Sequence, residues 1–449
     1  MEFADSYRDF FNVARRNVAD KARCYLAGLL MKAPRKNMER MEEYVAEFNY
    51  QAQQQFLSDS PWDYRALSDQ VSRDVDALLG GADAALVIDE SAFAKQGVKS
   101  VGVARQWNGR LGKVDNSQVG VFAVLTDGGR SSLVDERLYL PAKWIDDPER
   151  CDGAGIPDEC RVFKKKSELA LEMVDAACRN GMSFGWVLSD AGYGKEPQYL
   201  RDLDDRNLVF ISDVHRDQRI YAENPQIHLP VRTSAKGRAP TRHRAKGNSV
   251  AIDKYFNSVA DDQWQNHVLQ DTTRGKIKVK ACAKRLWLWD KKEKEAREWW
   301  AVCVKYADTG DTKWFLSNAP ENTEPRTLLL QHAKRFWVER TFEDAKGSVG
   351  MADYQARGWL AWHHHMAMVS LGMLFMLRER MVHNLDIELL SCNDIVELLH
   401  IYLPRADLTP AAVVRNIERR HRKRWAAIES ARRREKRREN EEKSDHAVF

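Results

Sequence analysis

Apolar residues follow two different spacings along this chain. As far as about residue 80 they recur every three or four positions, as between Leu67 and Leu78, which is typical of helices that bury one face. The pattern stops at Gly80 and Gly81, a common signal for the end of a helix. We therefore expect residues 1–80 to form an all-helical domain.

Two polar breaks predict helix starts in this part. Asn37 stands where it could cap the helix of MERMEEYVAEF. The run Ser60-Pro61-Trp62-Asp63 combines a capping serine, a proline at the first helical position and the acid of a capping box. The helix that stops at Gly80 is therefore expected to begin after Ser60.

From residue 81 onward, short apolar runs predict buried strands. AALVID ends at Asp89, NSQVGVFAVLTDGGRSSLVDERLYL holds two strands around a Gly-Gly turn, and FGWVLSD ends at Asp190. Helices are predicted from Ser167 and over EPQYLRDLDDR, and NLVFISDV predicts the last strand. This order of three strands, helix, strand, helix and strand indicates a mixed α/β protein with an RNase H-like core.

The remaining segments complete the predicted layout. The RNase H-like catalytic core is expected to comprise residues 81–215 and 321–385, and the second part carries a helix with Glu339. Residues 216–320 contain runs such as EWWAVCVKYAD and are predicted to form a β-rich insertion. Residues 386–449 end in a highly charged run and are expected to form a basic helical tail.

Composition narrows the class of protein. With 449 residues, of which 43% are hydrophobic and 31% charged, the chain can bury a large core. The first residues lack a signal-peptide pattern, and the longest apolar run, from Met366, is about half as long as a membrane span. Seven cysteines at irregular spacing do not suggest a disulfide framework. We expect a cytoplasmic protein that does not enter a membrane.

Three acidic residues suggest a metal-dependent active site. Asp89 and Asp190 each close a strand-like run. On one continuous helix, Arg335, Glu339 and Lys346 would fall within an arc of about 40°. Carboxylates that converge at one edge of a sheet suit a two-metal phosphodiester site, where oxygen ligands favour Mg²⁺ and admit Mn²⁺ as a substitute.

Other acids in these motifs remain open as alternatives. Glu90 neighbours the first aspartate but would point to the opposite face of its strand. Glu343 lies one turn after Glu339 on the same helix face, and geometry alone does not exclude it. Asp213 ends the last strand without an evident role.

Together these motifs resemble a known family. The pattern R-x3-E-x6-K from Arg335, with VIDES around Asp89 and LSDAGYG around Asp190, resembles the DDE transposases of bacterial insertion sequences. More narrowly it resembles the IS-four superfamily, whose signature is Y-x2-R-x3-E-x6-K. The tract SVGVARQWNGRLGKVDNSQVGV and the later LPAKWIDDPER resemble the IS-seven-hundred-one branch. The resemblance runs from about Cys24 to about Leu377.

The resemblance assigns the residues of the active site. It implies a metal-binding catalytic triad composed of Asp89, Asp190 and Glu339. The register of the signature also favours Glu339 over Glu343. Each active site would hold two Mg²⁺ ions, or Mn²⁺ in their place.

The N-terminal helices resemble the end-recognition part of the family, which implies that residues 1–80 form a helical DNA-binding domain. Further residues are also expected to contact DNA. By the resemblance, Arg335 and Lys346 bind phosphates near the transposon end, and His332 stands in place of the signature tyrosine. Trp314, in the insertion before the catalytic helix, is our candidate for stacking a flipped base. Basic residues of the helical domain and the insertion are candidate phosphate contacts: Arg35, Lys36, Arg238, Arg242, Arg244 and Lys246.

The activity that the resemblance implies is cut-and-paste transposition. Water nicks one strand at the transposon end, the freed 3′-hydroxyl attacks the opposite strand to form a hairpin, and the reopened end joins target DNA. The partners would be double-stranded DNA, as terminal inverted repeats and target, and a second copy of the chain in a homodimer on paired ends. In a bacterial cell the protein would associate with the nucleoid. The alternatives are an RNase H-like endonuclease without strand transfer and a non-catalytic DNA-binding protein derived from a transposase.

Overall fold

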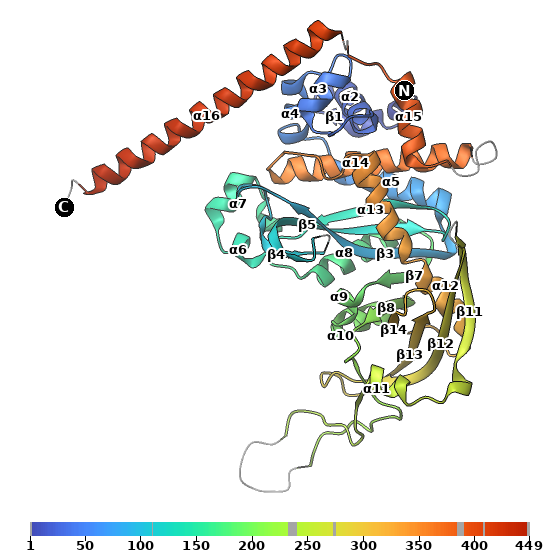
Figure 1. Cartoon of the computed structure of the whole chain (residues 1–449). Coiled ribbons are helices and arrows are strands. Elements are labelled where there is room, and N and C mark those ends of the chain that lie inside the picture. The colour runs from blue at the N-terminus through green and yellow to red at the C-terminus, as the bar shows by residue number, and fades with distance from the viewer. Residues whose placement is uncertain are drawn as a thin grey trace.

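The computed structural model of the chain describes residues 2–109, 111–231, 240–272, 275–383, 390–406 and 409–446. Figure 1 shows a group of N-terminal helices above one end of a large sheet, which the strands of the insertion extend downwards. The C-terminal helix projects from the top of the molecule (Figure 1). The mixed α/β class predicted from the sequence is confirmed.

The N-terminal part is mainly helical, as predicted, apart from a short hairpin. Its elements are α1 (Glu2–Asp5), η1 (Arg8–Phe11), β1 (Asn12–Val13), β2 (Arg16–Asn17), α2 (Ala19–Leu30), α3 (Met38–Tyr44), α4 (Tyr50–Ser58) and α5 (Tyr64–Leu79). Asn37 caps α3, since its side chain accepts a hydrogen bond from the backbone N–H of Arg40 at 3.1 Å. The start of α5 differs from the prediction. Asp63 is its N-cap, because the Asp63 side chain accepts from two backbone N–H groups of the first turn, and Ser60 lies outside the helix.

The central strands belong to one mixed sheet. They are β3 (Gly81–Ala94), β4 (Ala104–Asn108), β5 (Lys113–Thr126), β6 (Ser131–Leu138), β7 (Phe184–Ser189) and β8 (Phe210–Val214). The sheet order is β11-β12-β13-β14-β8-β7-β3-β5-β4, and β6 also pairs with β5. β3 runs antiparallel to β5 and parallel to β7, which is parallel to β8. β3 does not end at Asp89 as predicted but continues to Ala94, because its pairing with β5 extends that far.

Short helices connect these strands, and the predicted insertion extends the same sheet. The connecting elements are α6 (Ala142–Ile145), α7 (Pro148–Ala154), η2 (Asp158–Cys160), α8 (Lys166–Arg179), α9 (Ala191–Gly194) and α10 (Pro197–Asp205). The insertion contains β9 (Arg219–Ile220), β10 (Val250–Ala251), α11 (Ile252–Asn257), η3 (Asp261–Gln263), β11 (Gln265–Thr272), β12 (Gly275–Leu288), β13 (Arg297–Tyr306) and β14 (Thr312–Ser317). β14 pairs antiparallel with β8, and Trp314 stands opposite Val214. The insertion therefore lies directly beside the last core strand.

Two helices replace the single helix predicted around Glu339. α12 (Pro325–Ala333) ends before Lys334, and α13 (Phe336–Ser348) begins after Arg335. At the junction, the backbone N–H groups of Trp337 and Val338 bond to carbonyls three residues earlier, which is the tighter 3-10 geometry. Arg335 is consequently the N-cap residue of α13 and not a residue on the face of one continuous helix.

The last helices follow the predicted order. α14 (Trp359–Val382) is the buried helix expected from the apolar run. By length and composition alone this helix could cross a membrane, but 89% of its most apolar stretch is buried inside the protein. α15 (Cys392–Tyr402) and α16 (Pro410–His446) complete the described chain, and Arg420 of α16 forms an ion pair with Glu43 of α3.

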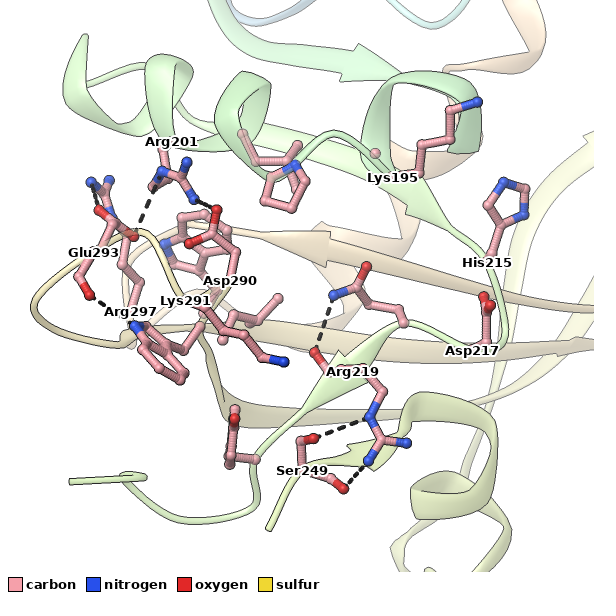
Figure 2. Close-up of a pocket in the computed structure, with 18 residues that line it drawn as sticks. Lys195, Arg201, His215, Asp217, Arg219, Ser249, Asp290, Lys291, Glu293 and Arg297 are labelled. Atoms are coloured by element: carbon pink, nitrogen blue, oxygen red, sulfur yellow. Dashed lines mark hydrogen bonds and ion pairs between the residues drawn. The ribbon is translucent and has the colours of Figure 1, made fainter. Parts of the chain in front are cut away.

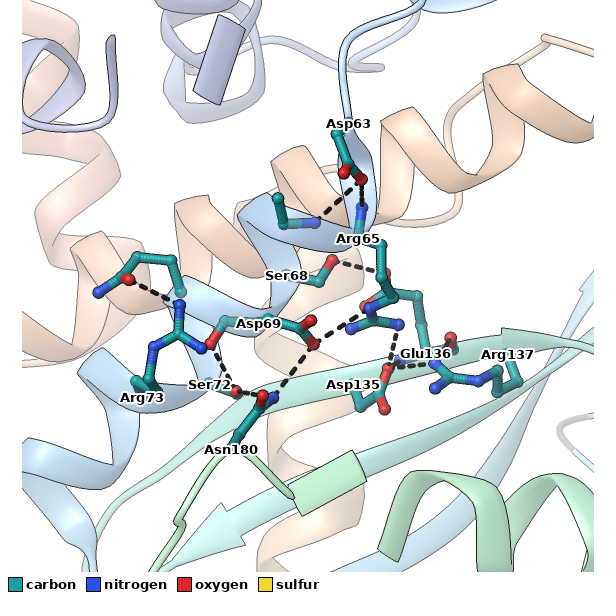
Figure 3. Close-up of polar contacts among 12 residues, drawn as sticks. Asp63, Arg65, Ser68, Asp69, Ser72, Arg73, Asp135, Glu136, Arg137 and Asn180 are labelled. Carbon is teal, nitrogen blue, oxygen red and sulfur yellow. Dashed lines mark hydrogen bonds and ion pairs between the residues drawn. The ribbon is translucent and has the colours of Figure 1, made fainter. Parts of the chain in front are cut away.

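A buried ionic network fastens α5 to the sheet (Figure 3). Arg65 lies 3.2 Å from Asp69 on its own helix and 2.8 Å from Asp135 of β6. Ser68 donates a hydrogen bond of 2.8 Å to Glu136, the next residue of β6. Burial raises the pKa of Glu136 to about 7, although Arg65 lies near it. The network joins the N-terminal helices to the edge of the core.

Candidate active site

Three aspartates stand side by side at one edge of the sheet. In the parallel strands, Ile88 of β3 pairs with Ser189 of β7, and Ser189 pairs with Ser212 of β8. The residues that follow this aligned row are Asp89, Asp190 and Asp213. The structure therefore brings the two predicted aspartates together, and it adds Asp213, for which no role was evident from the sequence.

Asp89 occupies the most crowded position of the row. Its side chain is 15% exposed, and its Oδ1 accepts a hydrogen bond of 2.7 Å from the backbone N–H of Glu90. Burial and the nearby charge of Asp190 raise the pKa of Asp89 to about 7, while Arg335 partly opposes them. A further positive charge beside this pair would stabilise the ionised form, which is the electrostatic condition for binding a divalent cation.

Asp190 is held by the start of α9. Its Oδ1 accepts hydrogen bonds from the backbone N–H groups of Gly192 at 2.9 Å and Tyr193 at 3.3 Å. A side chain at Gly194 would place a Cβ 1.9 Å from the carbonyl oxygen of Asp213. Glycine is therefore required for α9 to pack against β8, which keeps Asp190 at the edge of the sheet.

Arg335 links the row of aspartates to the helix that carries Glu339. Its guanidinium lies 3.2 Å from Asp213, 3.7 Å from Asp89 and 3.7 Å from Glu339. Burial acts to lower the pKa of Arg335, but the surrounding carboxylates raise it overall, so the side chain stays charged. Arg335 thus contacts both the row of aspartates and Glu339, although the predicted single helix is absent.

Asp213 holds two residues of the signature that we had expected to bind DNA directly. His332 Nε2 lies 2.6 Å from Asp213 Oδ1, and the imidazole stacks on Phe315 with 4.3 Å between ring centroids. Burial acts to raise the pKa of Asp213, but His332 and Arg335 lower it overall. His332 is 5% exposed and turned towards Asp213, and its contact with a phosphate stays a prediction.

One signal in the sequence could have identified Asp213. It ends a strand-like run in the same way as Asp89 and Asp190, and the predicted strand order already placed its strand in the core. In a parallel sheet the equivalent ends of neighbouring strands meet at one edge. The same reasoning that places Asp89 beside Asp190 therefore also places Asp213 beside them.

The alternative acids are engaged elsewhere. Glu343 lies 3.7 Å from Arg340 with 74% of its side chain exposed. Glu90 lies 2.7 Å from Lys166 of α8. Of the two glutamates on α13, Glu339 is the one that contacts Arg335, which favours it as the third acid.

The donor set fits a divalent cation. Asp89 and Asp190 supply hard carboxylate oxygens of the kind that Mg²⁺ and Mn²⁺ prefer. Within the described ranges, no group of three or more His, Cys, Asp or Glu side chains is already gathered at metal-binding distance. Glu339 is 62% exposed and would have to turn towards Asp89 to complete the predicted triad.

An open cleft of about 770 Å³ borders these acids. Its lining includes Asp190, Asp213, Arg335 and Trp314. The indole N–H of Trp314 is buried and has no hydrogen-bond partner among the residues that the structure describes. The tryptophan selected from the sequence therefore lies at the same cleft as the acids.

The predicted phosphate contacts of the helical domain fall in two different environments. Arg35 lines a second cavity together with Lys346, which is distant from it in the sequence. Lys36 is 3% exposed, and its amine donates to the backbone carbonyls of Leu29 and Ser348. The Lys36 amine therefore faces the backbone and not the surface, and its contact with a phosphate stays a prediction.

Three of the predicted phosphate contacts of the insertion lie on the surface. Arg242, Arg244 and Lys246 are exposed, and Arg244 forms a short β-bridge with His228. Arg238 lies outside the described residues. The three described cations remain candidate phosphate contacts.

A neighbouring pocket of about 510 Å³ lies between α10 and the turn from β12 to β13 (Figure 2). Arg201 of α10 forms ion pairs with Asp290 and Glu293 of this turn. Arg297 lies 2.6 Å from Glu293. Figure 2 shows Lys195 on the other side of the pocket from Arg201. These ion pairs fasten the insertion to the core and neutralise both arginines.

Comparison with known proteins shows the family to which the chain belongs. The model of the DDE superfamily endonucleases matches residues 9–276, so the chain belongs to this family. The matched segment contains all three aspartates of the row.

A more particular likeness is to the probable transposase for insertion sequence element IS701 from Microchaete diplosiphon. That protein is 23% identical over 357 residues, which cover 79% of this chain and 80% of the relative. The NurA nuclease from Sulfolobus solfataricus is a structural match with 11% identity and a TM-score of 0.23, over 73% of this chain and 95% of that one, and is too distant to inform the fold. The family resemblance inferred from the motifs is confirmed.

Proposed function

We propose that this protein is a cut-and-paste DNA transposase built on an RNase H-like core. The order β6-β5-β3-β7-β8, with antiparallel first strands and parallel last strands, supports this core. The β-rich segment that separates β8 from α13 has the position expected of an insertion before the third acid.

The observation that carries the proposal is the aligned pair Asp89 and Asp190, joined through Arg335 to Glu339. Two Mg²⁺ ions bound by these three acids, or Mn²⁺ in their place, would activate the attacking oxygen and stabilise the leaving one. Asp89 must lose its proton to bind a cation, and the charge of the bound cation would in turn lower the raised pKa of Asp89. Arg335 keeps positive charge beside the reacting phosphate.

The same cleft supports the expected handling of DNA. Trp314 lines it beside Asp190 and Arg335, where it could stack an extruded base during hairpin formation. Cleavage and joining of two transposon ends requires two active sites, so we expect a homodimer on paired ends and target DNA.

The test is incubation of the purified protein with duplexes from the two flanks of its own gene, followed by a denaturing gel. With Mg²⁺ we expect a nicked strand with a 3′-hydroxyl, a hairpin and products joined to target DNA, and none of them with EDTA. Cleavage without joined products would instead indicate an endonuclease without strand transfer. Binding without cleavage would indicate a non-catalytic DNA-binding protein.

A further inference from the structure

A second cavity, of about 1070 Å³, opens where the N-terminal helices meet the core. Its lining comes from the segment before α3, from α4, from the end of β3, from α13 and from the segment between α13 and α14. These segments are distant in sequence, so the cavity exists only in the folded chain.

The lining carries an excess of positive charge. Four cations border the cavity, namely Arg35, Lys95, Lys346 and Arg357. Asp353 is the acid in the lining, and its Oδ2 already accepts a hydrogen bond of 2.8 Å from the backbone N–H of Lys36. The cavity therefore has the charge balance of a site for an anion.

Lys95 shows most clearly that the lining of the cavity has more positive than negative charge. Its amine lies 3.5 Å from the ring centroid of Tyr354 and 3.4 Å from the carbonyl oxygen of the same residue. No carboxylate lies within ion-pair distance of Lys95 in the described part of the chain, and burial lowers its pKa to about 8. An anion in the cavity would stabilise the charged amine.

The cavity continues the line of the catalytic residues. Lys346 follows Glu339 by seven positions, or about 10 Å along α13. Lys95 follows Asp89 by six positions, or about 20 Å along the extended chain of β3. The two elements converge here, because the Lys346 amine lies 6.0 Å from the ring centroid of Phe93.

We infer that this cavity binds the phosphates of the DNA strand that leads away from the cleavage point. Since one strand advances about 3.4 Å per phosphate along the duplex axis, the contacts would fall roughly three to six nucleotides from the reacting phosphate. A single small anion would not require cations on several segments that are distant in sequence. Two of these cations, Arg35 and Arg357, are exposed and can therefore contact a larger ligand. The inference deepens the proposed function, because it rests on DNA being the substrate, and it adds Lys95 and Arg357 to the contacts.

The test is the salt dependence of DNA binding, measured by fluorescence anisotropy in EDTA so that no cleavage occurs. The variants are R357Q, at an exposed position, and the double variant K95Q/R357Q. In a plot of log affinity against log KCl concentration, each lost contact should reduce the slope by about 0.9 for a duplex, so the double variant should lose about 1.8. The control R179Q removes an exposed arginine of α8 that lies outside the cavity, and its slope should match the wild type.

The phosphates could belong to the transposon end or to DNA of any sequence. Two labelled duplexes of 30 base pairs distinguish these sources, since one comes from the flank of the gene and the other has an unrelated sequence. A reduced slope on the flank duplex alone assigns the cavity to the transposon end, and a reduction on both assigns it to DNA of any sequence. Unchanged slopes for R357Q and the double variant would overturn the inference. Failure of the wild type to cleave DNA would count against the proposed function instead, because binding is measured without a metal ion.

Discussion

At the scale of single residues, Arg335 connects the acids of the candidate active site. It lies within 3.7 Å of Asp89 and Glu339 and 3.2 Å from Asp213, so one guanidinium offsets charge from three carboxylates. Asp213 in turn fixes both Arg335 and His332. We interpret Asp213 as a positioning residue, because its contacts are with residues of the signature and not with the first two acids of the triad.

Replacement of Asp213 tests that role. D213N should slow single-turnover cleavage about 10- to 100-fold, as loss of a supporting partner does at metal sites, because Arg335 and His332 lose their shared anchor. DNA affinity in EDTA should stay within about twofold of the wild type. D217N, in an exposed residue of the same cleft, is the matched control and should cleave normally. Wild-type cleavage by D213N would show that Asp213 does not position Arg335 and His332 for cleavage.

At the scale of elements, the strands and the buried helix could be predicted, because each has a continuous apolar pattern. The single helix through Arg335 could not. Its sequence favours a helix throughout, and the 3-10 junction coincides with contacts between Arg335 and acids on two strands. The burial of Lys36 could not be predicted for a similar reason. Its acceptors are the backbone carbonyls of Leu29 and Ser348, which come close to the lysine amine only in the folded chain.

The histidines of α14 give this element a pH dependence. Burial lowers the pKa of His363 and His365 to about 3 and that of His364 to about 4. In the unfolded chain a histidine takes up a proton near pH 6.5. The stability that these residues contribute is therefore complete above about pH 6.5 and is lost as the pH falls towards 3 to 4.

A variant isolates one of these histidines. Between pH 6 and pH 4, the unfolding free energy of H365Q should fall less steeply than that of the wild type, by up to about 1.4 kcal/mol per pH unit. Urea titrations across this range measure the two slopes. H421Q, at an exposed position on α16, should retain the wild-type slope. Parallel curves for H365Q and the wild type would show that His365 takes up its proton equally in both states.

At the scale of the whole molecule, the N-terminal helices and the sheet form one continuous core. The network of Arg65 with Asp69 and Asp135 lies at their junction (Figure 3). The apolar pattern predicted each helix and strand separately, but it contained no information about which buried charges would meet.

Removal of Arg65 should weaken this junction. R65M leaves Asp135 with Arg137 as its partner and Glu136 still buried, so we expect a loss of about 3 kcal/mol in unfolding free energy. Urea unfolding at pH 7.5 measures the loss. R73M changes an exposed arginine of the same helix and should alter stability by less than about 0.5 kcal/mol. Equal stability of R65M and R73M would mean that the network contributes nothing.

The central claim is that Asp89, Asp190 and Glu339 act together, and that Glu343 does not. Its most direct measurement is the rate of single-turnover cleavage of a flank duplex in Mg²⁺ by D89N, D190N, E339Q and E343Q. We expect a loss of at least about 100-fold in D89N, D190N and E339Q and a change of less than about twofold in E343Q. Wild-type cleavage by E339Q, with loss of cleavage in E343Q, would contradict it.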